Sequence, residues 1–460
     1  MPINDSFRYL NIGLPEDILR RKLCGDFQGA LRLIDLRLSN EIPEALRQCL
    51  KVERELIARL EADYPFSLKE AMAIVKKDIP DFTEEEFRAL VDEFKIDWIY
   101  VRGEERYFDR FYDTLLKVNK DIAARAKRAR GHIDGEDEGD GDEGMLDRVI
   151  RIMEEKGSFG CRLRIRAAVK IKDEAFVPGK KVRVHIPLAA DARQIKNVMI
   201  HTISPEPSFI APADAAQRTV YFEEVMKENH EFSVEYSYDN VVEYVDPDPQ
   251  KVLKEQPDFF TGEENPHIVF TPYMKALSKE LTAHTENPLE KARAIYDFIT
   301  LNVKYSYMRE YFGLTDIAEN CARNFRGDCG VQALLFITLA RLCGIPAKWQ
   351  SGLNSSPESI GPHDWAEFYV APYGWMFADP SFGGGAHRAG AEHRRRFYFG
   401  NLDPYRMVAN REFQAAFTPD KKHWRCDPYD NQTGEIEYED RGLLYEEYTR
   451  SQELLECVEL

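Results

Sequence analysis

The segment 331–343, "VQALLFITLARLC", most strongly constrains how this chain can fold, because it is apolar on nearly every side. A helix without a polar stripe belongs inside a protein core. Gly344 and Pro346 follow directly and predict where the helix ends. The remaining chain must therefore supply layers of structure that cover this helix.

A cysteine stands at the predicted start of the helix, in "GDCGVQ". Cys329 would face unpaired N–H groups and the positive end of the helix dipole, which both favour thiolate over thiol. The eight cysteines are scattered, with no C-x-x-C pair, so the pattern indicates neither a disulfide framework nor a zinc ribbon. Position alone leaves two interpretations of Cys329 open, a small buried residue or a nucleophile.

The stretch "HDWAEFYVAPYGWMFADP" at 363–380 is typical of a β-hairpin and contains the groups that a nucleophilic cysteine needs. An unbulged hairpin with its turn centred on Ala371 would set His363 opposite Asp379. A carboxylate there would fix the imidazole tautomer and leave the other ring nitrogen for a thiol. Taken singly, the histidine is as well explained by a solvated strand start and the aspartate by a turn cap.

Three blocks in this order, "GDCGVQALLFITLARLCGIPAKWQSG", "HDWAEFYV" and "GWMFADPS", resemble the transglutaminase-like superfamily of papain-like thiol enzymes, in particular bacterial transglutaminase-like cysteine hydrolases. The resemblance covers roughly 265–410. It implies Cys329 as the nucleophile, His363 as general base and acid, and Asp379 as the carboxylate that orients the histidine.

The resemblance also implies an oxyanion hole, formed by the Cys329 backbone N–H and an upstream aromatic residue. Tyr305 is the best positional match and Tyr307 is a rival, while a tyrosine of the core is an equal alternative for both. Trp365 is a further candidate for contact with the substrate, because side chains alternate along a strand and it shares a face with His363.

The periodicity of the sequence divides the chain into units. We expect a helical domain at 1–130, an acidic disordered linker at 131–150, an antiparallel β domain at 158–245, the catalytic core at 265–410, and a C-terminal extension with an acidic helix at 411–460. The predicted fold class is α+β, with a helical domain, a sandwich-like sheet domain and a papain/transglutaminase-like core in which a buried helix packs on an antiparallel sheet.

The segment "GGGAHRAGAEHRRR" at 383–396 is predicted to be a loop rich in glycine and arginine. Its glycines permit positive φ and a hinge. Arg394, Arg395 and Arg396 form a basic island in an acidic protein. They are either a surface run paired with neighbouring acids, or a border of the substrate groove that recognises a carboxylate.

The net charge of −18 argues against binding to nucleic acid or to anionic lipid. The chain shows no secretion signal and no run approaching the ~18 apolar residues of a membrane span, so we expect a cytoplasmic location. No metal is expected, because Cys321, Cys329, Cys343 and His363 fit no compact zinc pattern, and no cofactor is indicated. The sequence leaves the oligomeric state open.

These features predict amide acyl transfer through a thioester, with a peptide or protein as substrate. Hydrolysis of a peptide or isopeptide-like amide is favoured over transglutamination, because no channel for an amine acceptor is indicated. A non-catalytic scaffold on the same fold is a third alternative. It is disfavoured because all three members of the triad are present.

Overall fold

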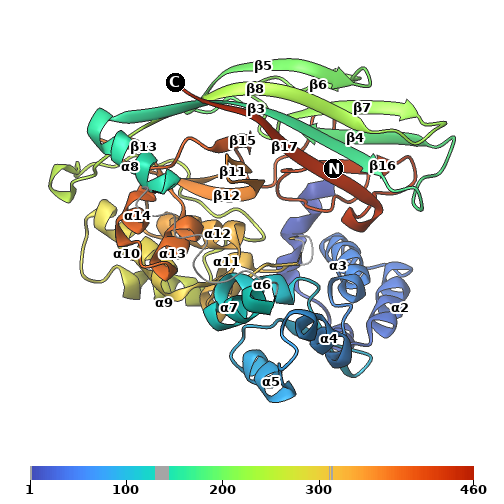
Figure 1. The fold of residues 1–460 in the computed structure, drawn as a ribbon. Coiled ribbons are helices and arrows are strands. Elements are labelled where there is room, and N and C mark those ends of the chain that lie inside the picture. Colours follow the sequence, from blue (N-terminus) through green and yellow to red (C-terminus); the bar gives the residue numbers. More distant parts are fainter. Residues whose placement is uncertain (1–2, 130–143, 310, 312–313) are drawn as a thin grey trace.

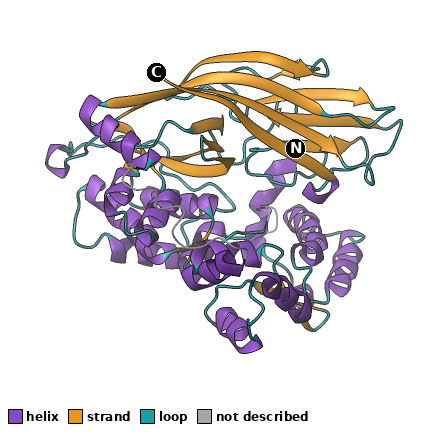
Figure 2. Cartoon of the chain, viewed as in Figure 1, coloured by secondary structure: helices purple, strands orange, loops and turns teal. Residues whose placement is uncertain are grey.

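The structure is a computed structural model that describes residues 3–129, 144–309, 311 and 314–460 (Figure 1). It has the expected α+β architecture. A two-layered β unit lies at the top of Figure 1, a smaller sheet lies beneath it, and most helices lie below that sheet. Figure 2 shows the same separation of strands and helices. Of the predicted acidic linker, 131–143 lies outside the described residues, and 145–150 belongs to a helix.

The N-terminal part is helical and has a hydrophobic core of its own. Its elements are η1 (Ile3–Ile12), α1 (Glu16–Leu23), α2 (Phe27–Leu38), α3 (Glu44–Asp63), α4 (Leu68–Asp78), α5 (Glu84–Asp92), the hairpin β1 (Trp98–Val101) and β2 (Glu104–Tyr107), α6 (Phe111–Val118) and α7 (Lys120–Ala129). Thr83 and Glu86 form a capping box at the start of α5. We call residues 3–129 the helical unit.

The antiparallel β domain is a pair of four-stranded sheets, preceded by α8 (Met145–Lys156). Its strands are β3 (Ser158–Ile171), β4 (Lys181–Pro187), β5 (Ile195–Ser204), β6 (Phe209–Ile210), β7 (Thr219–Val225) and β8 (Phe232–Glu243), joined by β16 (Glu435–Tyr438) and β17 (Tyr448–Glu459). The sheet orders are β17-β3-β8-β5 and β16-β4-β7-β6. Each sheet thus takes one strand from beyond the core, and the short helix η2 (Pro249–Lys251) leads from the domain into the core.

The prediction of an acidic C-terminal helix was wrong, because this segment forms the turn η4 (Tyr445–Glu447) and then β17. Strand β17 pairs antiparallel with β3, which places Glu453 opposite Arg166 and Glu456 opposite Arg164. Opposite charges across neighbouring strands stabilise the pairing. The acidic residues therefore match a basic strand far away in the sequence, which local helical spacing does not reveal.

The core surrounds the apolar helix that the sequence singles out, α12 (Cys329–Leu342), in which every residue from Cys329 to Arg341 is buried. It packs against β11 (Ala347–Ser356) and β12 (Ser359–Val370). The sheet has the order β14-β13-β12-β11-β15. The other core elements are α9 (Pro272–Leu281), α10 (Pro288–Asn302), β9 (Lys304–Tyr305), α11 (Ile317–Asn324), β10 (Arg326–Gly327), β13 (Gly374–Ala378), α13 (Pro380–Arg388), α14 (Glu392–Phe397), β14 (Phe399–Gly400) and β15 (Arg406–Asn410).

The prediction of a hinged loop at 383–396 was also wrong, because this segment forms α13 and α14. No positive φ occurs at its three consecutive glycines. A Cβ built on Gly383 would lie 1.9 Å from Tyr296 Oη, so this glycine lets α13 approach α10 closely. Close packing, rather than a hinge, explains the glycine there.

No helix in the described part of the chain is both long enough and apolar enough to cross a membrane.

Candidate active site

Cys329 is the first residue of α12, as its sequence position predicts. Asp328 caps the helix by accepting a hydrogen bond from the Val331 backbone N–H at 3.1 Å. The exposed fraction of Cys329 is 9 %. The following residue must be glycine, because a Cβ on Gly330 would lie 2.2 Å from Tyr311 Oη and 2.8 Å from Asp364 Oδ2.

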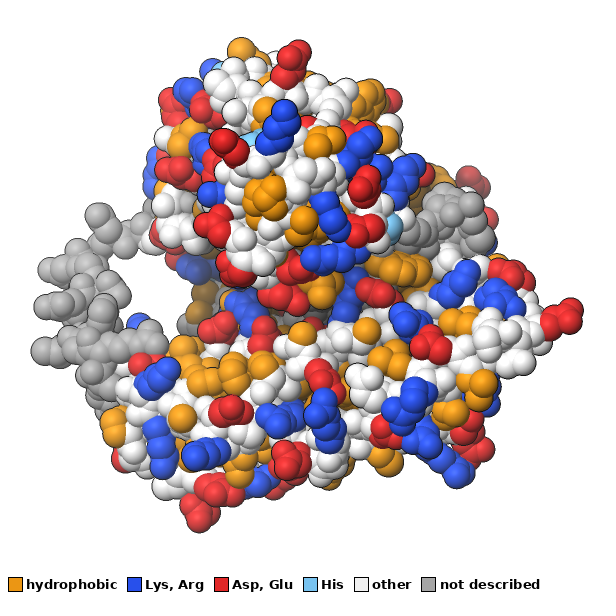
Figure 3. Space-filling view, turned by 90° about the vertical axis from the view of Figure 1, so that its right-hand side faces the viewer, with side chains coloured by type: hydrophobic (Ala, Val, Ile, Leu, Met, Phe, Trp, Pro, Cys, Tyr) orange, Lys and Arg blue, Asp and Glu red, His pale blue; other side chains and the backbone are white. Residues whose placement is uncertain are grey.

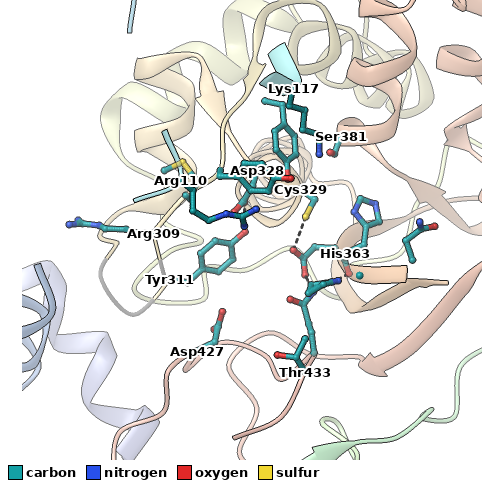
Figure 4. A pocket seen from close by; sticks show the side chains of 18 of the residues that line it. Arg110, Lys117, Arg309, Tyr311, Asp328, Cys329, His363, Ser381, Asp427 and Thr433 are labelled. Atoms are coloured by element: carbon teal, nitrogen blue, oxygen red, sulfur yellow. Dashed lines mark hydrogen bonds between the residues drawn. The ribbon is translucent and has the colours of Figure 1, made fainter. Parts of the chain in front are cut away.

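The hydrogen-bond partner of the Cys329 thiol is Asp364, a residue that the sequence analysis did not single out. Cys329 Sγ donates to Asp364 Oδ2 at 3.2 Å, and Figure 4 shows the sulfur directed at this carboxyl group. Gln432 holds the same carboxyl group from the other side, with Nε2 donating to Asp364 Oδ1 at 2.7 Å. No hydrogen bond joins Cys329 to His363, although both line one cavity.

The expected lowering of the Cys329 pKa is contradicted. Burial, and after it the negative charges of Asp364 and Asp328, raise the pKa of the Cys329 thiol well above its ordinary value. Burial also raises the pKa of Asp328, to about 6, and with nearby carboxylates raises that of Asp364. The helix N-terminus favours thiolate, but the buried carboxyl groups of Asp364 and Asp328 act in the opposite direction. The charge of Asp430 in turn raises the pKa of these two carboxyl groups.

His363 lies on β12 and contacts Asp379, with 2.7 Å between His363 Nε2 and Asp379 Oδ2. The hairpin register is shifted by two residues from the expected one, since Val370 pairs with Gly374 and the turn is centred on Pro372 rather than on Ala371. Asp379 therefore does not stand directly opposite His363 in the sheet. It follows the end of β13 and caps α13 through the Phe382 backbone N–H, and from that position its carboxylate reaches the imidazole.

A buried arginine supports this pair. Arg406 on β15 is 0 % exposed, and its Nη2 lies 3.1 Å from Asp379 Oδ2 and 2.7 Å from Asp403 Oδ2. Although burial alone would raise the pKa of Asp379, the contacts with His363 and Arg406 hold it below its ordinary value. Burial lowers the pKa of His363 despite the opposing charge of Asp379. The pair therefore favours an ionised carboxylate beside a neutral imidazole, which is able to accept a proton.

Cys329 and His363 open into one cavity of about 1250 Å³, which is built from three parts of the chain. The core contributes both residues, the helical unit contributes residues such as Arg110 and Lys117, and the segment after the core contributes Asp427 and Thr433 (Figure 4). Figure 3 shows basic and acidic side chains interspersed over one face of the molecule, with a hollow between its upper and lower parts.

The aromatic candidates occupy different positions relative to this cavity. Tyr305 and Tyr307 line it, because β9 runs parallel to β10 and pairs Tyr305 with Gly327, two residues before Cys329. Trp365 does not line it. Its side chain is buried behind His363, with a ring-centre distance of 5.9 Å, and its indole N–H donates to Gln350.

The three arginines of α14 are bound to acidic residues. Arg394 lines the cavity and pairs with Asp147 at 2.7 Å. Arg395 and Arg396 do not line it and both pair with Glu392. Recognition of a substrate carboxylate by these arginines stays a prediction.

Asp364 and Arg406 are the site residues that sequence reasoning missed. Asp364 follows His363 directly, so strand alternation assigns its side chain to the opposite face of β12. Its contact with Cys329 depends on how the start of α12 meets the strand. Arg406 carried no local signal apart from being a charged residue in an apolar stretch. Among the described residues, no three His, Cys, Asp or Glu side chains converge in a way that would hold a metal ion.

Comparison with known proteins places the site within a recognised fold. Residues 275–380 match the Transglutaminase-like superfamily. A candidate cysteine protease from Cytophaga hutchinsonii is 16 % identical, with a TM-score of 0.43 over 66 % of this chain and 91 % of that one. The periplasmic domain of TgpA from Pseudomonas aeruginosa is 13 % identical, with a TM-score of 0.28 over 55 % and 96 %. No curated protein matches the chain.

Proposed function

We propose, from the transglutaminase-like core at residues 275–380, that the protein is a thiol enzyme that hydrolyses an amide bond in a peptide-like substrate through a thioester on Cys329. The observation that carries this proposal is that Cys329 and His363 line one cavity and that Asp379 contacts His363 from behind. A thiol at a helix start and an imidazole held by a carboxylate are the parts of a nucleophile–base–orienter set.

In the proposed reaction, His363 takes the thiol proton as the sulfur attacks the carbonyl carbon. The tetrahedral intermediate collapses when His363 gives this proton to the leaving amine, which leaves an acyl thioester on Cys329. Water then attacks the thioester while His363 removes one of its protons, and the carboxylic acid departs as the thiol is restored. Because Asp364 holds the thiol in the resting state, Cys329 must leave this hydrogen bond before it attacks.

Water is favoured as the acceptor by the nature of the cavity wall. Aminolysis needs a passage from which water is excluded, and such a passage is apolar. The described lining includes several charged residues, and these keep the cavity hydrated: Asp63, Asp109, Arg110, Lys117, Arg388 and Glu446. Transglutamination by the same residues is the alternative, and the experiment must distinguish it from hydrolysis.

The experiment is an acceptor competition with a pool of peptides in H₂¹⁸O that also contains a primary amine. Hydrolysis predicts product acids with ¹⁸O at the new carboxyl group, whereas transglutamination predicts amides of the added amine. Mass spectrometry measures both products in one sample. The matched control is Cys457→Ala, which removes a cysteine outside the cavity and should leave product formation unchanged.

Cys329→Ala and His363→Ala should each abolish both products. If amine-containing products dominate, the hydrolase assignment is wrong and the enzyme is a transglutaminase. If the Cys329→Ala protein forms products as fast as the unmodified protein, Cys329 is not the nucleophile.

A further inference from the structure

Two positively charged side chains from separate parts of the chain line the cavity. Lys117 lies in the last turn of α6, in the helical unit, and Arg388 is the last residue of α13, in the core. Both line the cavity that contains Cys329. Figure 4 shows the Lys117 side chain reaching toward Ser381, at the start of α13.

Tyr305 holds the lysine in place. Lys117 Nζ lies 3.7 Å from the centre of the Tyr305 ring, a distance at which a cation is attracted to the ring face. Tyr305 is itself fixed beside the start of α12 by the pairing of β9 with β10. The Tyr305 ring therefore gives the exposed Lys117 side chain a fixed contact beside the start of α12.

Neither cation forms an ion pair within the part of the chain that the structure describes, although the charge of Asp328 at the start of α12 acts on Lys117. No carboxylate pairs with Lys117 or Arg388, and neither donates a hydrogen bond to a side chain or carbonyl. Lys117 is an exposed side chain on the wall of the cavity. Desolvation by the surrounding protein lowers the pKa of Lys117, and the positive charge of Arg388 adds to this shift, while the nearby Cys329 and Asp328 oppose it.

The lack of ion pairs at Lys117 and Arg388 contrasts with the arginines of α14. The protein neutralises each arginine there, Arg394 with Asp147 and both Arg395 and Arg396 with Glu392. Two like charges that converge in a partly enclosed site repel each other, and an anion between them relieves this repulsion. The anion must then come from a bound molecule.

We propose that Lys117 and Arg388 form a carboxylate-binding subsite beside Cys329, which selects substrates that carry a free carboxylate close to the amide that is cleaved. The planar guanidinium suits a two-point contact with a carboxylate, and the ammonium adds a point charge. The carboxylate belongs either to a peptide C-terminus or to an Asp or Glu side chain. The inference rests on the proposed function, and it gives the helical unit the task of supplying half of the subsite.

The test compares two alkylating reagents that differ in charge, iodoacetate and iodoacetamide. Peptide mapping by mass spectrometry measures the rate at which each reagent modifies Cys329. The ratio of the two rates cancels changes in thiol pKa and in general accessibility, because both reagents attack the same thiolate. A cationic subsite attracts the anionic reagent, so this ratio reports the subsite without any knowledge of the substrate.

In the double variant Lys117→Gln and Arg388→Gln, the iodoacetate-to-iodoacetamide ratio should fall about fivefold, which corresponds to about 1 kcal/mol. The matched controls are Lys120→Gln and Arg396→Gln, which remove exposed cations that do not line the cavity. They should leave the ratio unchanged. An unchanged ratio in the double variant overturns the subsite, and so does an equal fall in the controls, because it would reflect the general charge of the protein.

A binding measurement identifies the source of the carboxylate. Fluorescence anisotropy on the Cys329→Ala protein compares peptides with a free or amidated C-terminus, each with Glu or Gln in its sequence. We expect one of these exchanges to weaken binding about fivefold, and Lys117→Gln with Arg388→Gln to abolish the difference. If all four peptides bind equally, the subsite is overturned.

The two proposals fail in different ways. If Cys329 is not modified faster than the remaining seven cysteines and no amide is cleaved, the proposed function is wrong. Selective binding of carboxylate peptides to the Cys329→Ala protein would still establish the subsite in that case. Cleavage without any preference for carboxylates would establish the function and overturn the subsite.

Discussion

Asp364 controls how easily the Cys329 thiol loses its proton. The thiol donates a hydrogen bond to Asp364 Oδ2, so a negative charge on this carboxyl group opposes a negative charge on the sulfur. Burial and neighbouring carboxylates raise the pKa of Asp364 itself. The carboxyl group therefore takes up a proton at a higher pH than an ordinary aspartate, and once protonated it ceases to oppose the thiolate.

Replacing Asp364 with asparagine should make Cys329 reactive at lower pH. The variant removes the nearest negative charge, so the thiol pKa falls and the pH midpoint of alkylation by iodoacetamide moves down. The measurement is the alkylation rate of Cys329 as a function of pH. Glu446→Gln, which removes a charge from the same cavity wall without contact to the thiol, is the control. A midpoint that moves upward or stays constant in Asp364→Asn would refute this role.

Asp379 should contribute both to activity and to stability against acid. Its folded-state pKa lies below the ordinary value, so the ionised group stabilises the fold above that value, and this stabilisation is lost as the pH falls through the folded-state pKa. Asp379→Asn should lower the free energy of unfolding at pH 7 by about 3 kcal/mol, since Arg406 loses a buried partner. It should leave partial activity, because asparagine still orients the imidazole.

Urea denaturation of the unmodified protein and the variant at pH 7 and pH 3 measures this effect. The difference between the two proteins should shrink at pH 3. The exposed Asp420→Asn serves as the control and should differ little from the unmodified protein at either pH. An equal difference at both pH values would mean that Asp379 acts through packing alone.

At the level of elements, α13 depends on one glycine far more than on its neighbour two residues later. A Cβ on Gly383 would meet Tyr296 Oη at 1.9 Å, whereas a Cβ on Gly385 meets nothing closer than 3.8 Å. We expect Gly383→Ala to destabilise the protein by roughly 1–3 kcal/mol through overpacking. Gly385→Ala should be neutral or stabilise by up to about 1 kcal/mol, because alanine favours helix.

Thermal unfolding of the two variants provides the measurement. They add the same methyl group to the same helix, so their difference isolates the contact with α10. Equal melting temperatures would show that α13 can move away from α10 without cost.

The elements of the fold differ in whether they can be predicted from the sequence. The start of α12 at Cys329 follows from a local signal, and the structure confirms it. The helix caps at Thr83 and Asn287 are likewise formed by residues close together in the sequence. Helix α13 and strand β17 were missed because their causes lie far away in the chain. The three consecutive glycines locally favour a loop, and only the packing of Tyr296 on the first of them, Gly383, explains the helix. The spacing of residues in β17 locally favours a helix, and only its pairing with β3 explains the strand.

The residues of the candidate site also differ in whether they can be predicted from the sequence. Residue types and spacing drew attention to Cys329, His363 and Asp379, and the pocket places the first two together. The carboxyl group of Asp364 and the guanidinium of Arg406 depend on packing between elements that a single sequence does not reveal.

At the level of the whole molecule, the helical unit is attached close to Cys329. Arg326, three residues before Cys329, pairs with Asp97 of the helical unit at 2.7 Å, and both side chains are about one-fifth exposed. A double-mutant cycle with Arg326→Gln and Asp97→Asn should give a coupling energy of roughly 1 kcal/mol in urea denaturation. The exposed pair Arg37–Asp17, which lies within the helical unit, should give a few tenths. Equal couplings would show that the contact between the two units adds nothing.

The arrangement of the β domain has a consequence for how the protein matures on the ribosome. Strands β16 and β17 complete the two sheets, but they are synthesised only after the whole core has been made. A nascent chain can fold its helical unit early, because that unit has its own hydrophobic core. The two sheets can be completed only afterwards, and so can the part of the cavity wall formed by Thr433, just before β16, and by Arg450 and Gln452 on β17. Translation thus delays assembly of the cavity until β3 has acquired its distant partner, and an unfinished chain has no complete cavity around its Cys329 thiol.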